Sequence, residues 1–69
     1  MLDIGKCRKG DIIGHKKTSR AYEYNGIVKC KVDGCWVDMH MYSSYFGEIE
    51  SFCRFEHDFS GFTLIKTRR

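Results

Sequence analysis

The chain has 69 residues, of which 42% are hydrophobic and 30% charged, and its formal net charge is +3. So short a chain buries only about 60% of its surface on folding, which excludes two domains and predicts one modest core within residues 1–69. Ten aromatic side chains argue against disorder. No stretch approaches the roughly 18 apolar residues of a membrane span, and the first ten residues contain no apolar signal core, so we expect a soluble, cytoplasmic protein without membrane partners.

The first half of the chain predicts short strands followed by a hairpin. Residues 11–14 and 21–24 are strand candidates joined by a basic loop. In residues 27–32, Val28, Cys30 and Val32 alternate with polar or solvent-facing neighbours, which is typical of a half-buried strand. Asp33 and Gly34 follow directly and suit the two positive-φ positions of a type I′ turn. The partner strand is therefore predicted to begin at residue 35.

Two faces are expected for that partner strand. One face carries Cys35, Val37, Met39 and Met41, and the other carries Trp36, Asp38, His40 and Tyr42. Both strands of the hairpin are therefore predicted to offer an apolar face. Residues 43–47 are predicted to form a loop.

The remaining elements are another strand, a short turn and a last strand. In residues 48–56, Ile49, Cys53 and Phe55 alternate against Glu50, Phe52, Arg54 and Glu56. Residues 57–61 suit one turn of α- or 3₁₀-helix that ends at Gly61, and residues 62–66 suit a final strand. About five short strands at about ten-residue spacing predict a mainly β fold, namely a small SH3-like antiparallel barrel with at most one helical turn.

Several short motifs occur in a fixed order, namely residues 10–17 (Gly-Asp-Ile-Ile-Gly-His-Lys-Lys), residues 24–27 (Tyr-Asn-Gly-Ile), a central strand ending at Tyr42, residues 52–54 (Phe-Cys-Arg), Phe59 and Phe62. This order resembles that in a family of small uncharacterised bacterial and phage proteins. The chain departs from the family at Gly14, where an aromatic commonly precedes His-Lys, and it lacks a proline after Arg54. The resemblance spans residues 10–65 and implies an SH3-like β-barrel and a phage setting, without implying an activity.

Metal and cofactor sites are not expected. A structural zinc site usually has close pairs such as Cys-x2-Cys, whereas the closest pair here is Cys30 and Cys35, on either side of the predicted turn. Without an export signal, we expect these thiols, with Cys7 and Cys53, to be free rather than paired in disulfides. We therefore predict neither a metal site nor a cofactor.

Catalysis is not expected either. The nearest approaches to a catalytic set are Cys53 with His57 and Asp58, and His40 with Asp38, and neither belongs to a recognisable motif. A barrel this small also has little room for a preformed substrate pocket. We therefore predict that the protein is not an enzyme and that it has no catalytic residues.

Binding of a host protein is the first functional prediction. Residues 33–65 have a formal net charge of −5, and their acidic and aromatic side chains form the candidate surface, namely Asp38, Tyr42, Tyr45, Phe46, Glu48 and Glu50. Exposed aromatics in a loop often anchor interfaces, although Tyr45 and Phe46 could instead fold back to cap the barrel. If the acidic side chains mimic phosphates, the inhibited or modulated target is a nucleic-acid enzyme, and a host defence component is another candidate.

Nucleic-acid binding is the alternative. Residues 1–32 have a formal net charge of +5, so the molecule is predicted to be dipolar. Its basic face would consist of Lys6, Arg8, Lys9, His15, Lys16, Lys17 and Arg20. Tyr22, Tyr24, Trp36 and Tyr42 would supply stacking surfaces. The competing interpretation is that these are solvated loop lysines and core aromatics.

Two residues in the resembling motifs are predicted to be structural. Asp11 is expected in the opening turn, and Arg54 is expected to pair with an acidic neighbour. A homodimer stays open as well, because an edge strand of so small a sheet can pair with a second copy.

Overall fold

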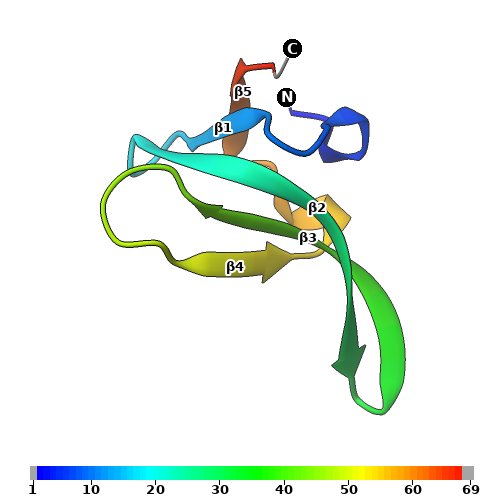
Figure 1. Ribbon diagram of the computed structural model, residues 1–69. Coiled ribbons are helices and arrows are strands. Elements are labelled where there is room, and N and C mark those ends of the chain that lie inside the picture. The colour runs from blue at the N-terminus through cyan, green and yellow to red at the C-terminus, as the bar shows by residue number, and fades with distance from the viewer. Residues whose placement is uncertain (1, 68–69) are drawn as a thin grey trace.

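The computed structural model describes residues 2–67 (Figure 1). Its elements are η1 (Ile4–Lys6), β1 (Ile12–His15), β2 (Arg20–Val32), β3 (Cys35–Ser44), β4 (Ser51–Arg54), η2 (Glu56–Asp58) and β5 (Phe62–Lys66). The five strands form one antiparallel sheet in the order β4-β3-β2-β1-β5, and the sheet is not closed. The prediction of a mainly β fold is confirmed. No helix in residues 2–67 is long and apolar enough to span a membrane.

The predicted hairpin and the predicted last strand are both confirmed. Asp33 and Gly34 both have positive φ, at 50° and 81°, as a type I′ turn requires, and Val32 pairs with Cys35 across it. The final strand has the predicted bounds, and η2 is the predicted short turn, shifted to residues 56–58. Local sequence signals were sufficient for these elements.

A β-bulge joins two of the predicted strands into one. Residues 21–24 and 27–32 belong to the single strand β2, whose register against β3 shifts between Tyr24 and Gly26. The bulged residue Asn25 donates a hydrogen bond from Nδ2 to Ser43 Oγ at 3.0 Å. Gly26 has a φ of 97°, a conformation that favours glycine, and the side-chain stem of Lys9 lies where a Cβ would project.

The bulge determines which face of the hairpin reaches the core. Tyr24 pairs with Tyr42 on the core side, whereas Val28 pairs with Met39 on the opposite, outer face. Val28 and Cys30 are half-buried and Lys29 and Lys31 are exposed, as the predicted alternation requires, but this apolar face lies on the outer side of the sheet, and Val32 is exposed. One extra residue shifts all later side chains of a strand to the opposite face. If residues 20–32 are treated as a regular strand without the bulge, the side chains on one side of Asn25 are therefore assigned to the wrong face of the sheet.

The strand after β3 is shorter than predicted, and its faces alternate as predicted. β4 covers only residues 51–54 of the predicted 48–56. Its Phe52 stacks on Tyr42, with ring centroids 5.5 Å apart, so Phe52 lies on the core side. Cys53 pairs with Met41 and therefore lies on the outer face.

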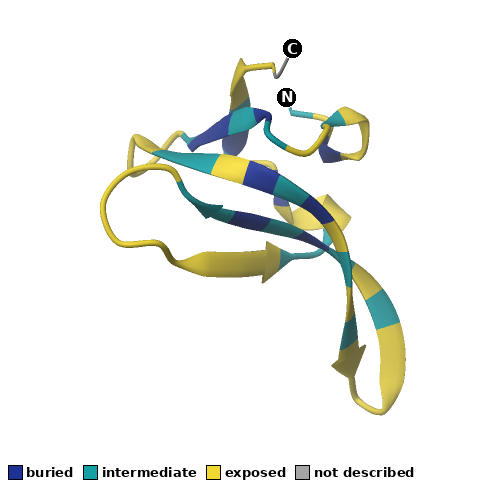
Figure 2. Cartoon of the chain, in the orientation of Figure 1, coloured by how far each residue is buried: buried dark blue, intermediate teal, exposed yellow. Residues whose placement is uncertain are grey.

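One small core lies on the inner face of the sheet. It consists of six buried hydrophobic residues, namely Ile4, Ile13, Tyr24, Tyr42, Phe59 and Phe62. Ile4 comes from η1 and Phe59 directly follows η2, so these two short turns cover the inner face. Figure 2 shows that the buried positions are confined to the body of the molecule and that the far half of the hairpin lies outside it.

Polar contacts fix the margins of this core. The hydroxyl of Tyr24 lies 2.6 Å from Nδ1 of the buried His40, and Nε2 of His40 lies 3.3 Å from Glu56 Oε1. Asp11 is buried and accepts a hydrogen bond from the backbone N–H of Arg8 at 3.0 Å. The predicted structural role of Asp11 is thus confirmed.

Arg54 ties β4 to the same core. Its Nε donates a 2.8 Å hydrogen bond to the hydroxyl of Tyr42, and its guanidinium lies 5.2 Å from the ring centroid of Phe62. Its Nη1 lies 3.5 Å from Asp58 Oδ2, so the predicted acidic partner is Asp58. The predicted structural role of Arg54 is confirmed.

The far half of the β2–β3 hairpin forms an arm, residues 27–39, that extends away from the body (Figure 1). On its inner-face side, Lys29 Nζ pairs with Asp38 Oδ1 at 2.8 Å. Lys31 Nζ lies 6.0 Å from the ring centroid of Trp36, whose relative exposure is 67%. Cross-strand side-chain pairs stabilise the arm, because the core residues do not reach it.

Candidate functional site

The two most exposed large hydrophobic side chains, Phe46 and Ile49, lie in residues 45–50, the acidic–aromatic loop between β3 and β4. Tyr45, Phe46 and Ile49 are 50%, 74% and 85% exposed. The Tyr45 and Phe46 rings contact each other edge to face, with centroids 4.8 Å apart. The two aromatics therefore do not cap the core, and that alternative prediction is wrong.

Ser44 holds this loop in place. Its Oγ donates a hydrogen bond to the Glu48 carbonyl at 2.6 Å and accepts one from the Glu50 N–H at 2.9 Å. Its backbone N–H donates to the Glu50 carbonyl at 2.9 Å, and the Tyr45 N–H donates to the Ala21 carbonyl of β2 at 3.1 Å. Sequence reasoning missed Ser44, although serine before a glycine-containing loop often bonds to nearby backbone groups.

A hollow of about 460 Å³ opens on one side of the acidic–aromatic loop, and we call it the loop hollow. Its lining residues come from the β1–β2 turn, the start of β2, the end of β3, the loop and β4, namely Ser19, Arg20, Ala21, Tyr22, Ser44, Phe46, Glu48, Glu50 and Phe52. Three aromatic rings and two carboxylates thus share one depression with a single guanidinium.

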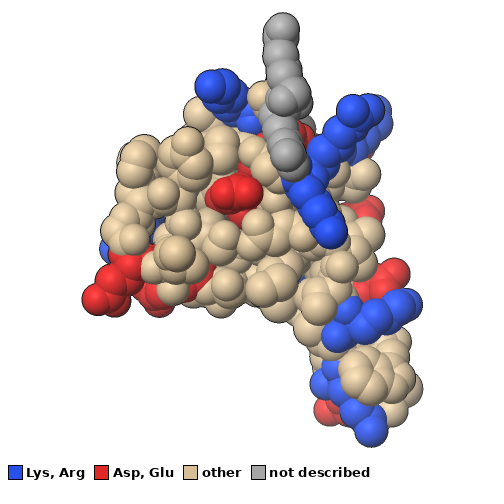
Figure 3. Space-filling model, viewed as in Figure 1, with Lys and Arg blue, Asp and Glu red and all other residues tan. Residues whose placement is uncertain are grey.

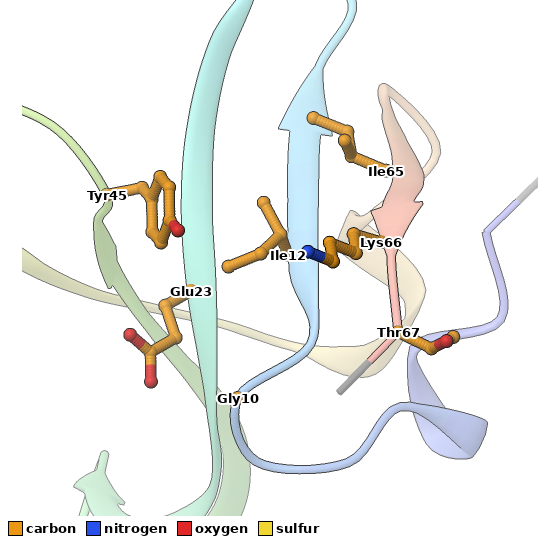
Figure 4. Close-up of a pocket in the computed structure, with 7 residues that line it drawn as sticks. All are labelled: Gly10, Ile12, Glu23, Tyr45, Ile65, Lys66 and Thr67. Carbon is orange, nitrogen blue, oxygen red and sulfur yellow. The ribbon is translucent and has the colours of Figure 1, made fainter. Parts of the chain in front are cut away.

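A wider, shallow hollow of about 850 Å³, the outer hollow, lies on the outer face of the sheet. Figure 4 shows Tyr45 and Glu23 along one side, Ile65 and Lys66 along the other, and Ile12 between them. Tyr45 and Phe46 are consecutive, yet they border different hollows. The acidic–aromatic loop therefore forms a ridge between two concave surfaces.

The structure brings together four of the six predicted protein-binding residues. Tyr45, Phe46, Glu48 and Glu50 all belong to the acidic–aromatic loop. Tyr42 is only 4% exposed and is part of the core, so it leaves the candidate surface. Asp38 lies on the hairpin arm and pairs with Lys29, away from the loop.

The predicted basic face is divided. Lys6, Arg8 and Lys9 precede β1, whereas Lys16, Lys17 and Arg20 follow it, and four strand residues separate the groups by about 13 Å. His15 packs edge to face on Phe62, with centroids 4.9 Å apart, and its Nδ1 lies 3.4 Å from the Thr18 N–H nitrogen. The basic residues therefore fall into two groups, one on either side of β1 in the chain.

The predicted stacking aromatics are divided as well. Tyr24 and Tyr42 are buried in the core, Tyr22 packs against it, and Trp36 is exposed on the arm. In the view of Figure 3, acidic side chains gather at the lower left, and basic side chains lie at the upper left, on the right and on the arm, with further acidic side chains among those on the right and on the arm.

The nucleophile candidate Cys53 lies in an unsuitable setting. Burial, and then the neighbouring Cys30, raise the pKa of the Cys53 thiol, the opposite of what activates a cysteine. His57 stacks on Phe55, with centroids 5.5 Å apart, and His40 bonds Tyr24 and Glu56 rather than Asp38. All four cysteines are free thiols. In residues 2–67, no three His, Cys, Asp or Glu side chains converge as a metal site would require.

Compared with known proteins, the chain matches no protein-family model, no curated protein and no solved structure. The resemblance to the bacterial and phage family thus stays a prediction, and the functional argument depends on the surface itself.

Proposed function

We propose that the chain is a non-enzymatic binding protein that docks on another protein through the acidic–aromatic loop. The observation that carries this proposal is that Phe46 and Ile49 are exposed on a loop whose backbone Ser44 holds in place. Exposed apolar side chains gain free energy when a partner covers them. A loop that is already ordered loses less conformational entropy on binding than a flexible one.

The architecture proposed for this protein is an open variant of the SH3-like barrel. The strand order β4-β3-β2-β1-β5, with the 3₁₀ turn η2 between β4 and β5, supports it. A phage setting and a host target rest on the family resemblance. Glu48 and Glu50 beside exposed aromatics suit a target with a basic surface, such as a nucleic-acid enzyme or a host defence component.

An affinity pull-down from bacterial lysate, with and without nuclease, tests the proposal. We expect a stoichiometric protein partner that survives nuclease and is lost with the double variant Tyr45→Ala/Phe46→Ala. The matched control is Trp36→Ala, which removes an aromatic of comparable exposure from the arm and should retain the partner.

Two results would contradict the loop as the docking surface. If nuclease removes every captured partner, nucleic acid is the ligand and the alternative function holds. If Trp36→Ala abolishes capture while the double loop variant retains it, the arm is the interface.

A further inference from the structure

We propose that the loop hollow receives the alkylammonium head of a lysine side chain presented by the partner. This inference rests on the proposed function and specifies the chemistry of its central contact. Aromatic faces and carboxylates both attract cations, and the loop hollow combines them.

The aromatic walls come from separate segments and are held by the core. Phe52 stacks on Tyr42 and meets the edge of Tyr22, with ring centroids 5.5 Å and 6.0 Å apart. Phe52 is nevertheless 39% exposed, so it stays accessible from the hollow. Phe46 lines the same hollow from the acidic–aromatic loop. Two of the three rings thus have orientations fixed by packing before any ligand arrives.

The charges of the loop hollow favour a cation over an anion. Glu48 and Glu50 contribute two carboxylates, against one guanidinium from Arg20. Within residues 2–67, neither glutamate makes an ion pair with a basic side chain. An incoming ammonium group gains attraction to both carboxylates, whereas a phosphate would be repelled by them.

The size of the loop hollow also suits a single side chain. Its volume of about 460 Å³ lies at the lower end of the range for small-ligand sites, roughly 300–1,000 Å³. The hollow is open to solvent on one side, which leaves room for the backbone of the partner. A lysine side chain can place its methylenes along Phe46 and its ammonium beside the carboxylates.

Titration of ¹⁵N-labelled protein with three probes tests this inference. The probes are N-acetyl-lysine methylamide, its Nζ-trimethyl form, and the neutral isostere N-acetyl-norleucine methylamide. We expect both cations to shift the amide signals of residues 46–52 with dissociation constants of roughly 10–100 mM, as one exposed cation–π contact beside two exposed carboxylates implies, and norleucine to bind at least about tenfold more weakly. A tighter trimethyl form would identify the rings as the main contact, and equal affinities would identify the carboxylates.

Variants locate the site. Glu48→Gln/Glu50→Gln should weaken binding of the lysine probe about tenfold, and Phe46→Ala should weaken it severalfold. Phe46 is exposed, so its replacement leaves the core intact. Glu23→Gln, which removes an exposed carboxylate from the outer hollow, is the matched control and should leave binding unchanged.

The inference is overturned if norleucine binds as well as lysine, if the double glutamine variant keeps full affinity, or if inorganic phosphate shifts these amides instead. If the protein does not bind the lysine probe but still captures a protein partner in the pull-down, the proposed function stands and only the cation contact is refuted. If the protein binds the lysine probe but captures no protein partner, the proposed function is refuted and the cation contact stands.

Discussion

Replacement of Arg54 by lysine tests whether β4, the strand that supports the acidic–aromatic loop, is held by one guanidinium. Arg54→Lys keeps the positive charge, and with it the attraction to Asp58. It removes the Nε donor 2.8 Å from the Tyr42 hydroxyl and the planar group over Phe62. A lysine ammonium cannot make both contacts from one position.

The expected loss follows from these contacts. A hydrogen bond from a charged donor contributes about 1.5–3 kcal/mol, and a cation over an aromatic ring at a partly exposed site adds about 0.5–1 kcal/mol. The retained Asp58 pair is largely exposed and contributes roughly 0–1 kcal/mol in either protein. Since lysine keeps part of the ring contact, we expect the free energy of unfolding to fall by about 2 kcal/mol. For a chain of this size, that corresponds to a Tm lower by roughly 8–16 °C.

Urea and thermal unfolding followed by far-UV circular dichroism measure this effect, with Asp58→Asn as the control. Asp58→Asn removes only the ion pair, so it should cost less than about 1 kcal/mol. A loss below about 0.5 kcal/mol for Arg54→Lys would refute the role of the Tyr42 and Phe62 contacts. So would an Asp58→Asn variant as unstable as Arg54→Lys, because the ion pair would then be the dominant contact.

Three further predictions follow from the loop, the core and the buried tyrosine. Ser44→Ala removes both side-chain hydrogen bonds of the acidic–aromatic loop, so hydrogen exchange at the Glu50 amide should accelerate at least about tenfold while Tm falls by only a few degrees; unchanged exchange would contradict the role of Ser44. Phe59→Ala should lower the free energy of unfolding by about 3–5 kcal/mol, enough to unfold much of the protein, whereas Phe46→Ala should change it by less than about 0.5 kcal/mol. Equal losses in the two variants, measured by urea unfolding, would contradict the assignment of Phe59 to the core and Phe46 to the surface. Burial, and to a lesser extent Cys7 and Glu56, raise the pKa of the Tyr24 hydroxyl. As the pH rises above about 10, the unfolded chain therefore loses this proton before the folded protein does, and the free energy of unfolding should decline. Urea midpoints measured at pH 8–11 should decline less in Tyr24→Phe than in the unmodified protein, and an equal decline would exclude Tyr24 as the cause.

Local signals were sufficient to predict several elements from the sequence. Asp33-Gly34 fixed the hairpin turn because both positions need positive φ, and the strand at residues 62–66 was bounded by Gly61. The alternation of faces along the arm agrees with the sequence pattern, since the register shows no irregularity beyond Gly26. Arg54 and Asp11 were correctly assigned structural roles from their motif context.

The rest depends on tertiary context. The bulge at Asn25 is not visible in an alternating pattern, yet it decides that Tyr24, rather than Val28, faces the core. The sequence pattern predicts Tyr42 on a binding surface, and only its packing against Phe59 and Phe62 shows that it is buried. The loop hollow escaped prediction because its walls come from segments distant in the chain, which converge only when the sheet forms.

The position of Trp36 has a consequence for how the folding of this protein is followed. Trp36 is the single tryptophan of the chain, and it lies on the arm, outside the core. Its fluorescence emission is therefore a local probe, which reports fraying of the hairpin arm and changes in the immediate surroundings of the Trp36 ring, including Lys31. A tryptophan signal that changes at lower urea than circular dichroism would measure the opening of a peripheral ribbon while the sheet around Tyr42 remains intact.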